Sequence, residues 1–323
     1  MSRNRVRSIV EPRCLAMVFA VGSLSACVNV DFQEPVGKFS GSMTTANAII
    51  GNYFTEMNDF EREVYLQQAL YDPTIAIGTV SPEGRRTGLI PVFSGESIKA
   101  RMDALSLLTA YSERLAALAG ADAPTRFNAG SQVLGTNLKN LAQTFDDLGT
   151  SGDGQSGDST ASRYVGPIST IVGIFGEMYL DARRDAALTR AVTDGAPQVD
   201  AVLNQIEADL VSVIDPLRVS GLLQQLADSQ TYYNANRSTM TFEQRQAMLA
   251  RIDAIASRYQ AAVTARPGEA VDGIRDAHAA LVEYATSSRR PEDLVALTAA
   301  IETFNNRLRP LVENLRKLQG EDT

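Results

Sequence analysis

Three side chains in this sequence are of the types that most often perform covalent or metal chemistry: Cys14, Cys27 and His278. A structural zinc site normally takes four Cys or His ligands, so the chain is too poor in both residue types for the usual site. A Ser-His-Asp triad would have to use His278, and no Gly-x-Ser-x-Gly motif is present. We therefore predict no metal, no cofactor and no identifiable catalytic residue. A hydrolase that uses paired carboxylates stays open, because Asp and Glu are plentiful.

The position of Cys27 is informative because of what precedes it. Residues 1–13 carry four arginines and one glutamate, and residues 14–26 carry no charge. A basic head, a short apolar body and small residues at the end are typical of a secretory signal segment. A permanent membrane-spanning helix needs about 20 apolar residues, which is longer than this run. The alternatives are an uncleaved anchor or a buried helix.

The stretch Leu24-Ser25-Ala26-Cys27 resembles the lipobox of bacterial lipoproteins, which has an aliphatic residue, two small residues and a cysteine. The resemblance covers the first 27 residues and says nothing about the rest. It implies that the Cys27 thiol is linked to a diacylglycerol, that cleavage follows Ala26, and that the new amino group is acylated. Two or more acyl chains anchor a protein stably, whereas one binds weakly. Val28 takes the place where an aspartate would favour the inner membrane, so we expect the outer membrane, facing the periplasm.

The net charge of the chain after residue 26 limits the classes of partner that it can bind. Removal of residues 1–26 takes away four arginines and one glutamate, which changes the net charge from −8 to −11. Nucleic-acid binding normally requires a basic face, so we expect no nucleic acid as a partner. We expect the lipid anchor to be the membrane contact. Because Cys14 leaves with the signal segment and Cys27 is lipidated, we expect no disulfide.

Apolar periodicity predicts an all-α fold. Along the last segment, apolar residues alternate at spacings of three and four, the pattern of a coiled-coil seam: Leu294, Leu297, Ile301, Phe304, Leu308, Leu311, Leu315 and Leu318. Pro310 lies inside this seam and should kink the helix. Similar stripes occur at 49–64, 98–118, 134–148 and 199–217, and Thr241 with Gln244 fits a capping box. We predict an elongated antiparallel bundle of about eight helices.

The domain boundaries follow from the interruptions. We predict a cleaved signal peptide at 1–26, a lipidated cysteine with a flexible tether at 27–41, a helical bundle domain at 42–319 and a tail at 320–323. The Gly/Ser/Asp-rich loop at 149–162 reads as a flexible linker, since its aspartates miss the spacing of an EF-hand.

Residues 71–97 lack helical periodicity. Two β-branched or apolar runs flank Ser81-Pro82-Glu83-Gly84, a good turn sequence, so a β-hairpin excursion is possible. One interpretation makes this excursion a lid over the end of the bundle. The other makes it a partner surface, because long loops in compact domains often carry function. The residues proposed for partner contact are Ile75, Ile77, Val80, Arg85, Arg86, Leu89 and Ile90.

These observations lead to a structural or protein-interaction role at the bacterial envelope, with an unidentified envelope protein as partner. The alternative is a module that binds a small ligand between helices, near Gly173 and Glu177, where Gly166, Thr170 and Gly173 form a face of small residues. An enzyme is the third possibility.

Overall fold

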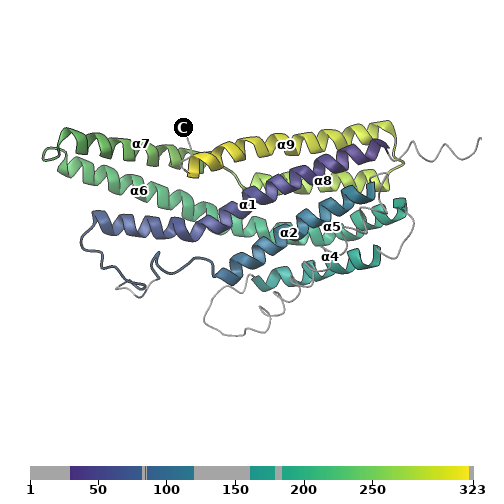
Figure 1. Cartoon of the computed structure of the whole chain (residues 1–323), viewed down its shortest axis with the longest axis horizontal. Coiled ribbons are helices and arrows are strands. Elements are labelled where there is room, and N and C mark those ends of the chain that lie inside the picture. Colours follow the sequence, from purple (N-terminus) through teal and green to yellow (C-terminus); the bar gives the residue numbers. More distant parts are fainter. Residues whose placement is uncertain (1–29, 82–83, 85, 120–160, 179–183, 320–323) are drawn as a thin grey trace, which may run out of the picture.

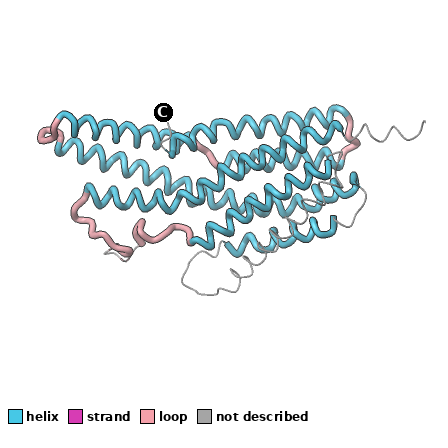
Figure 2. Tube along the Cα trace, in the orientation of Figure 1, coloured by secondary structure: helices cyan, strands magenta, loops and turns pink. Residues whose placement is uncertain are grey.

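The computed structural model describes residues 30–81, 84, 86–119, 161–178 and 184–319 (Figure 1). Its described part is all helix and loop, with no strand (Figure 2). The all-α prediction is therefore confirmed for these residues. The elements are α1 (Val30–Tyr71), α2 (Gly95–Ala119), the 3-10 turn η1 (Ala161–Tyr164), α4 (Val165–Met178), α5 (Arg184–Asp209), the π turn η2 (Leu210–Ile214), α6 (Asp215–Asn236), α7 (Phe242–Thr264), α8 (Gly268–Thr286) and α9 (Pro291–Gln319).

Helix α1 runs along most of the elongated molecule and organises the others around it (Figure 1). Its first half packs on α8 and α9, where Phe32 stacks on Tyr284 and Phe39 lies 6.5 Å from Phe304 between ring centroids. Its middle packs on α2, and its last turns pack on α6. At 1.5 Å per residue, these 42 residues span about 63 Å. The two ends of α1 therefore mark opposite ends of the bundle.

The chain starts its first helix earlier than the sequence pattern suggested. Residues 27–41 were expected to be a tether, but α1 begins at Val30 and runs through Pro35. Phe32, Val36 and Phe39 are buried at helical spacing, and this stripe continues into Met43. The tether prediction is wrong from residue 30 onward, because the proline and two glycines obscured a real apolar face.

Helices α5 and α6 form one continuous helical run through the π turn. The prediction of about eight separate helices did not include such a continuous pair. Within the turn, the Asp215 N–H bonds to the Leu210 carbonyl, five residues back. Pro216 follows directly, has no N–H to donate and crowds the preceding turn. A widened π turn accommodates these constraints without ending the helix.

Several local predictions hold. All members of the α9 seam are buried except Leu294, which is half-buried, and the helix continues through Pro310. The Thr241 hydroxyl accepts from the Gln244 N–H and the Gln244 side chain accepts from the Thr241 N–H, as a capping box requires. The stripe at 134–148 and the loop at 149–160 lie outside the described residues.

The excursion between α1 and α2 is not the β-hairpin that the sequence allowed. Its described residues contain one isolated bridge, between Val80 and Arg86, and no strand. The turn itself is present, since the Gly84 N–H bonds to the Ser81 carbonyl at 2.9 Å and Gly84 has a φ of +77°. The excursion combines turn-like hydrogen bonds of its own with bonds to Asn58 and Tyr65 of α1, and no regular strand pairing forms among its described residues.

Candidate interaction surface

The excursion is fixed to the second half of α1 by two polar side chains. The Asn58 amide donates to the Phe93 carbonyl at 2.8 Å and accepts from the Phe93 N–H at 3.0 Å. The Tyr65 hydroxyl donates to the Ala76 carbonyl and accepts from the Gly78 N–H, both at 3.1 Å. These bonds hold the backbone at Ala76, Gly78 and Phe93 against α1.

The residues proposed for partner contact take different positions within this excursion. Ile77 and Val80 are 60% and 54% exposed, whereas Ile75, Leu89 and Ile90 are half-buried. Arg86 is exposed and donates to the Pro91 carbonyl at 3.3 Å. Arg85 lies outside the described residues. The structure thus presents two of the five aliphatic side chains openly and uses the other three partly to pack the loop.

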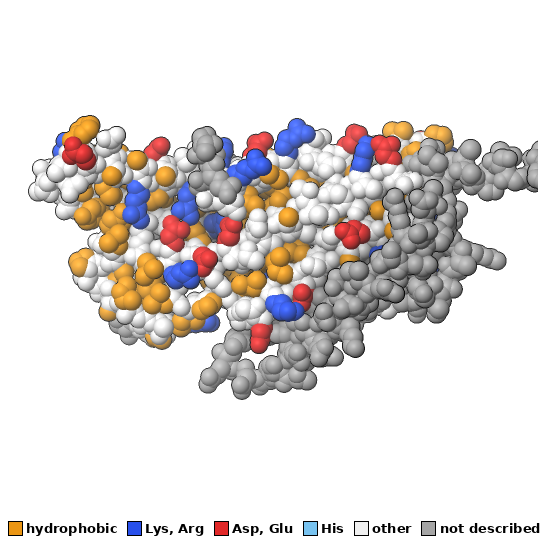
Figure 3. Space-filling model, in the orientation of Figure 1, with side chains coloured by type: hydrophobic (Ala, Val, Ile, Leu, Met, Phe, Trp, Pro, Cys, Tyr) orange, Lys and Arg blue, Asp and Glu red, His pale blue; other side chains and the backbone are white. Residues whose placement is uncertain are grey.

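The predictions from sequence did not include a set of exposed apolar side chains in the same half of the molecule as the excursion. They extend from the end of α1 onto α6 and α7, each at least 44% exposed: Leu66, Leu70, Leu223, Phe242 and Leu249. In Figure 3 the hydrophobic side chains gather at this end of the molecule. A sequence signal did exist, because Leu66 and Leu70 lie off the buried stripe of α1. We call the surface formed by these five residues with Ile77 and Val80 the distal apolar surface.

A groove crosses this end between α1, the excursion and α6. It has two hollows of about 660 and 540 Å³, and both are lined by Gln68, Ile75 and Gln224. Such volumes lie within the range of ligand-binding clefts. The groove is partly apolar and partly polar, and it opens beside the exposed Ile77 and Val80.

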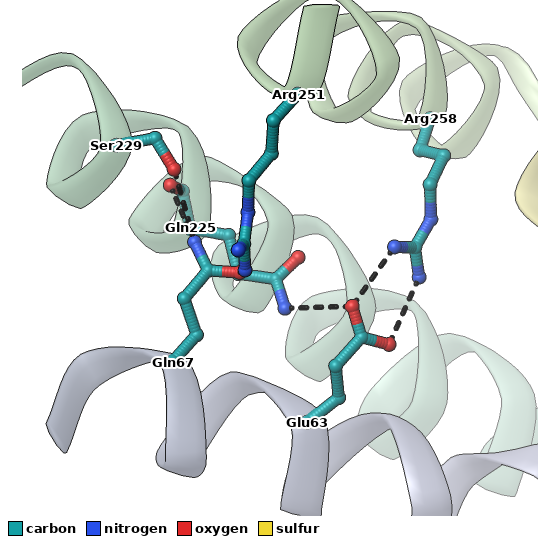
Figure 4. A network of polar contacts seen from close by, with 6 residues as sticks. All are labelled: Glu63, Gln67, Gln225, Ser229, Arg251 and Arg258. Atoms are coloured by element: carbon teal, nitrogen blue, oxygen red, sulfur yellow. Dashed lines mark hydrogen bonds and ion pairs between the residues drawn. The ribbon is translucent and has the colours of Figure 1, made fainter. Parts of the chain in front are cut away.

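A polar network lies behind the groove and joins α1, α6 and α7 (Figure 4). The Arg258 guanidinium donates to both oxygens of Glu63, at 3.0 and 3.4 Å, and the Gln225 amide donates to the same carboxylate at 3.2 Å. Gln67 donates to the Gln225 carbonyl and accepts from Arg251, both at 3.0 Å. The network connects α6 and α7 to α1 through residues adjacent in sequence to Val64, Gln68 and Gln224 of the groove.

The carboxylates beside this network are engaged with arginines. Glu56, Asp59 and Glu63 line a further hollow of about 370 Å³. Burial raises the pKa of Glu63, but the hydrogen bonds and charge of Arg258 outweigh it and hold the pKa below its usual range. A general acid needs the opposite shift. This arrangement supports an ion-pair network between helices and not acid–base chemistry at Glu63.

Two further polar clusters are buried between helices of the bundle. At the π turn, the Arg101 Nε donates to an Asp209 oxygen at 2.8 Å, and the Tyr164 hydroxyl donates to the same oxygen at 2.9 Å. His278 is buried and shares a hydrogen bond of 2.7 Å with the Tyr111 hydroxyl. Burial lowers the pKa of His278 to about 4. Both clusters are shut away from solvent, which suits a structural role.

The ligand site considered near Gly173 lies on α4, close in the sequence to parts of the chain that are outside the described residues. Gly166, Thr170 and Gly173 are exposed on α4, and no described atom lies within 4 Å of a Cβ placed on Gly173. Among the described residues, no helix packs against this face, and the ligand site between helices stays a prediction. The Glu177 side chain lies outside the described part of the chain.

The described residues contain no group of three His, Cys, Asp or Glu side chains placed to hold a metal ion. Among the helices of the same residues, none combines the length and the apolar content that crossing a bilayer requires. No protein-family model, curated protein or solved structure matches the chain.

Proposed function

We propose that this protein is a lipid-anchored module of the bacterial envelope that binds a protein partner through its distal apolar surface. The observation that carries the proposal is the concentration of exposed large apolar side chains at one end of the molecule. Soluble monomers rarely expose a large apolar patch unless the patch is used. The groove beside them adds the shape that a specific partner needs.

The position of the lipobox supports this arrangement. Cys27 lies three residues before Val30, where α1 begins. Three residues of extended chain reach about 10 Å. A lipid on Cys27 would therefore hold the start of α1 close to the membrane, and the distal apolar surface would lie at the other end of a helix about 63 Å long.

Acylation has a direct test. Cys27→Ala should move the protein to the soluble fraction or leave an uncleaved precursor. Mass spectrometry of the wild-type protein from membranes should show an acylated Cys27 as the first residue. A mature chain that begins elsewhere and carries no lipid would remove the anchor from the proposal.

The interaction requires a paired substitution. Ile77→Glu with Val80→Glu places two charges on the distal apolar surface, and Val295→Glu places one on an apolar side chain that is 68% exposed near the start of α9. Partners are crosslinked in membranes and recovered with each variant. The first variant should lose a partner that wild type and Val295→Glu retain. Equal recovery with all three chains would contradict the proposal.

A further inference from the structure

The hollow at the far end of the groove combines aromatic rings with carboxylates and has no basic residue in its lining. It lies between the end of α1 and α6, has a volume of about 540 Å³, and is lined by Gln68, Tyr71, Asp72, Pro73, Ile75, Gln224, Asp228, Thr231, Tyr232, Ala235 and Asn236. This composition is unlike the hollow beside Glu63, where Arg218 and Arg258 contribute positive charge.

The two carboxylates differ in their hydrogen-bond partners, and those of Asp72 favour its charged form. Asp72 accepts from the Thr74 hydroxyl at 2.6 Å and the Thr74 N–H at 2.9 Å, and these bonds lower the pKa of Asp72. One oxygen of Asp228 accepts from the Gln224 amide at 2.7 Å. The other oxygen is shielded from water and has no hydrogen-bond partner among the described residues. Asp228 takes part in none of the described ion pairs. Its carboxylate therefore favours a positively charged ligand.

The aromatic rings add a second attraction for a cation. The Tyr71 and Tyr232 rings lie 4.9 Å apart between centroids, and Tyr232 is 38% exposed. The Arg251 guanidinium already lies 5.6 Å from the centre of the Tyr71 ring. A cation over a tyrosine face is attracted by the ring quadrupole, most strongly where water is excluded. The pair is thus suited to stack a further guanidinium or ammonium group beside the two carboxylates.

We propose that this hollow binds an arginine or lysine side chain carried by an extended peptide segment of the partner. The inference rests on the proposed function and deepens it. A peptide fits because the hollow continues into the larger one, past Gln68, Ile75 and Gln224, where Val64 and Leu217 offer apolar contacts. A basic segment also complements the net negative charge of the chain.

The test uses the purified full chain and labelled hexapeptides that differ at one position. That position holds arginine, lysine or citrulline, which keeps the shape of arginine without its charge, and two leucines flank it. Fluorescence anisotropy should show the arginine and lysine peptides binding about tenfold or more tightly than the citrulline peptide. Asp228→Asn should remove this preference, and Asp253→Asn, on the exposed face of α7, should leave it intact.

The other outcomes of these binding experiments also support or overturn the proposal. Equal binding of the three peptides, or a charge preference that survives Asp228→Asn, overturns the proposal. If Asp228→Asn does not fold, Tyr232→Leu tests the stacking in its place and should weaken the basic peptides selectively. Free arginine amide that binds as tightly as the peptide would make the hollow a small-molecule site and overturn the peptide assignment. A crosslinked partner that is lost with Ile77→Glu and Val80→Glu but kept with Asp228→Asn would leave the proposed function standing and reject the inference.

Discussion

Arg101 and Asp209 form an ion pair that is closed off from water where α5 widens into the π turn. The Nε–Oδ2 distance is 2.8 Å, and the two side chains are 1% and 6% exposed. The guanidinium also lies 4.5 Å from the centre of the Phe93 ring, so the pair connects α2 and α5 with the end of the excursion. A buried ion pair costs desolvation, but removing one partner leaves a charge that nothing compensates.

We predict that Asp209→Ala destabilises the protein by about 3–5 kcal/mol, because Arg101 would stay buried without its counterion. Urea denaturation followed by circular dichroism measures the change. Asp59→Ala is the matched control, since its partner Arg62 and Asp59 itself are 53% and 73% exposed. A surface pair of this kind contributes about 0–1 kcal/mol. Equal losses in the two variants would show that burial of the pair has no energetic consequence.

The α9 seam supplies a second prediction. Leu308 is 3% exposed, so Leu308→Ala should cost about 2–5 kcal/mol through lost burial and a residual cavity. Leu249→Ala removes the same atoms from a side chain that is 50% exposed and should change stability by no more than about 0.5 kcal/mol. The two unfolding midpoints in urea give the comparison. An unchanged midpoint for Leu308→Ala would mean that the seam is not packed.

The buried His278 predicts a dependence of stability on pH. Burial disfavours the charged ring and lowers the pKa of His278 from its usual 6.5 to about 4. The unfolded chain therefore binds the proton at a higher pH than the folded chain does. This contribution to stability is fully present above pH 6.5 and is lost as the pH falls toward 4, by up to about 3 kcal/mol at about 1.4 kcal/mol per pKa unit.

The measurement for His278 compares the slope of unfolding free energy against pH in wild type and His278→Gln. Carboxylates such as Asp215, whose pKa burial raises to about 6 despite Arg218, act in both chains and cancel in the difference. Wild type should lose stability faster than the variant between pH 6.5 and pH 4. Parallel curves would show that His278 takes up its proton without unfolding the protein.

Features that depend on residues close together in the sequence were predicted correctly, and contacts between distant residues were not predicted. The seam of α9 and the capping box at Thr241 are set by spacing within one helix, and both were correct. The ion pair of Arg101 and Asp209 joins residues 108 positions apart, and no local pattern reports such a pairing. Tyr71 and Tyr232 are also far apart in the sequence, so their contact forms only in the folded chain and has no local sequence signal.

The errors also have physical causes. The tether was predicted because Pro35 is unfavourable inside a helix. Phe32, Val36 and Phe39 nevertheless follow a helical spacing, and α1 includes all of them. The apolar runs in the excursion read as strands because β-branched residues favour extended backbone. Some of their backbone groups instead bond to Tyr65 and Asn58 of α1, and others bond in turns within the excursion. The periodicity of apolar residues predicts the secondary structure of a segment. It does not predict which helix a loop will pack against.

At Gly88 the backbone of the excursion lies directly against the backbone of α1. A Cβ on Gly88 would clash with the Glu61 carbonyl oxygen and lie 2.6 Å from the Tyr65 Cβ. The Glu61 carbonyl belongs to the helix backbone and cannot move aside. We therefore predict that Gly88→Ala pushes the excursion away from α1 and weakens the bonds between Tyr65 and residues 76–78.

Hydrogen–deuterium exchange provides the measurement for Gly88→Ala. Amides of residues 74–90 should exchange faster, while those of α5 and α8 should keep their protection, because the clash is confined to the loop. Gly78→Ala is the control in the same excursion, since its Cβ would meet only the Val80 carbonyl at an ordinary 3.5 Å. If the excursion helps to form the partner surface, Gly88→Ala also reduces crosslinked partner recovery, and Gly78→Ala does not. Faster exchange in α5 and α8 together with the loop would instead mean that the excursion is part of the cooperative core and acts as a lid on the bundle.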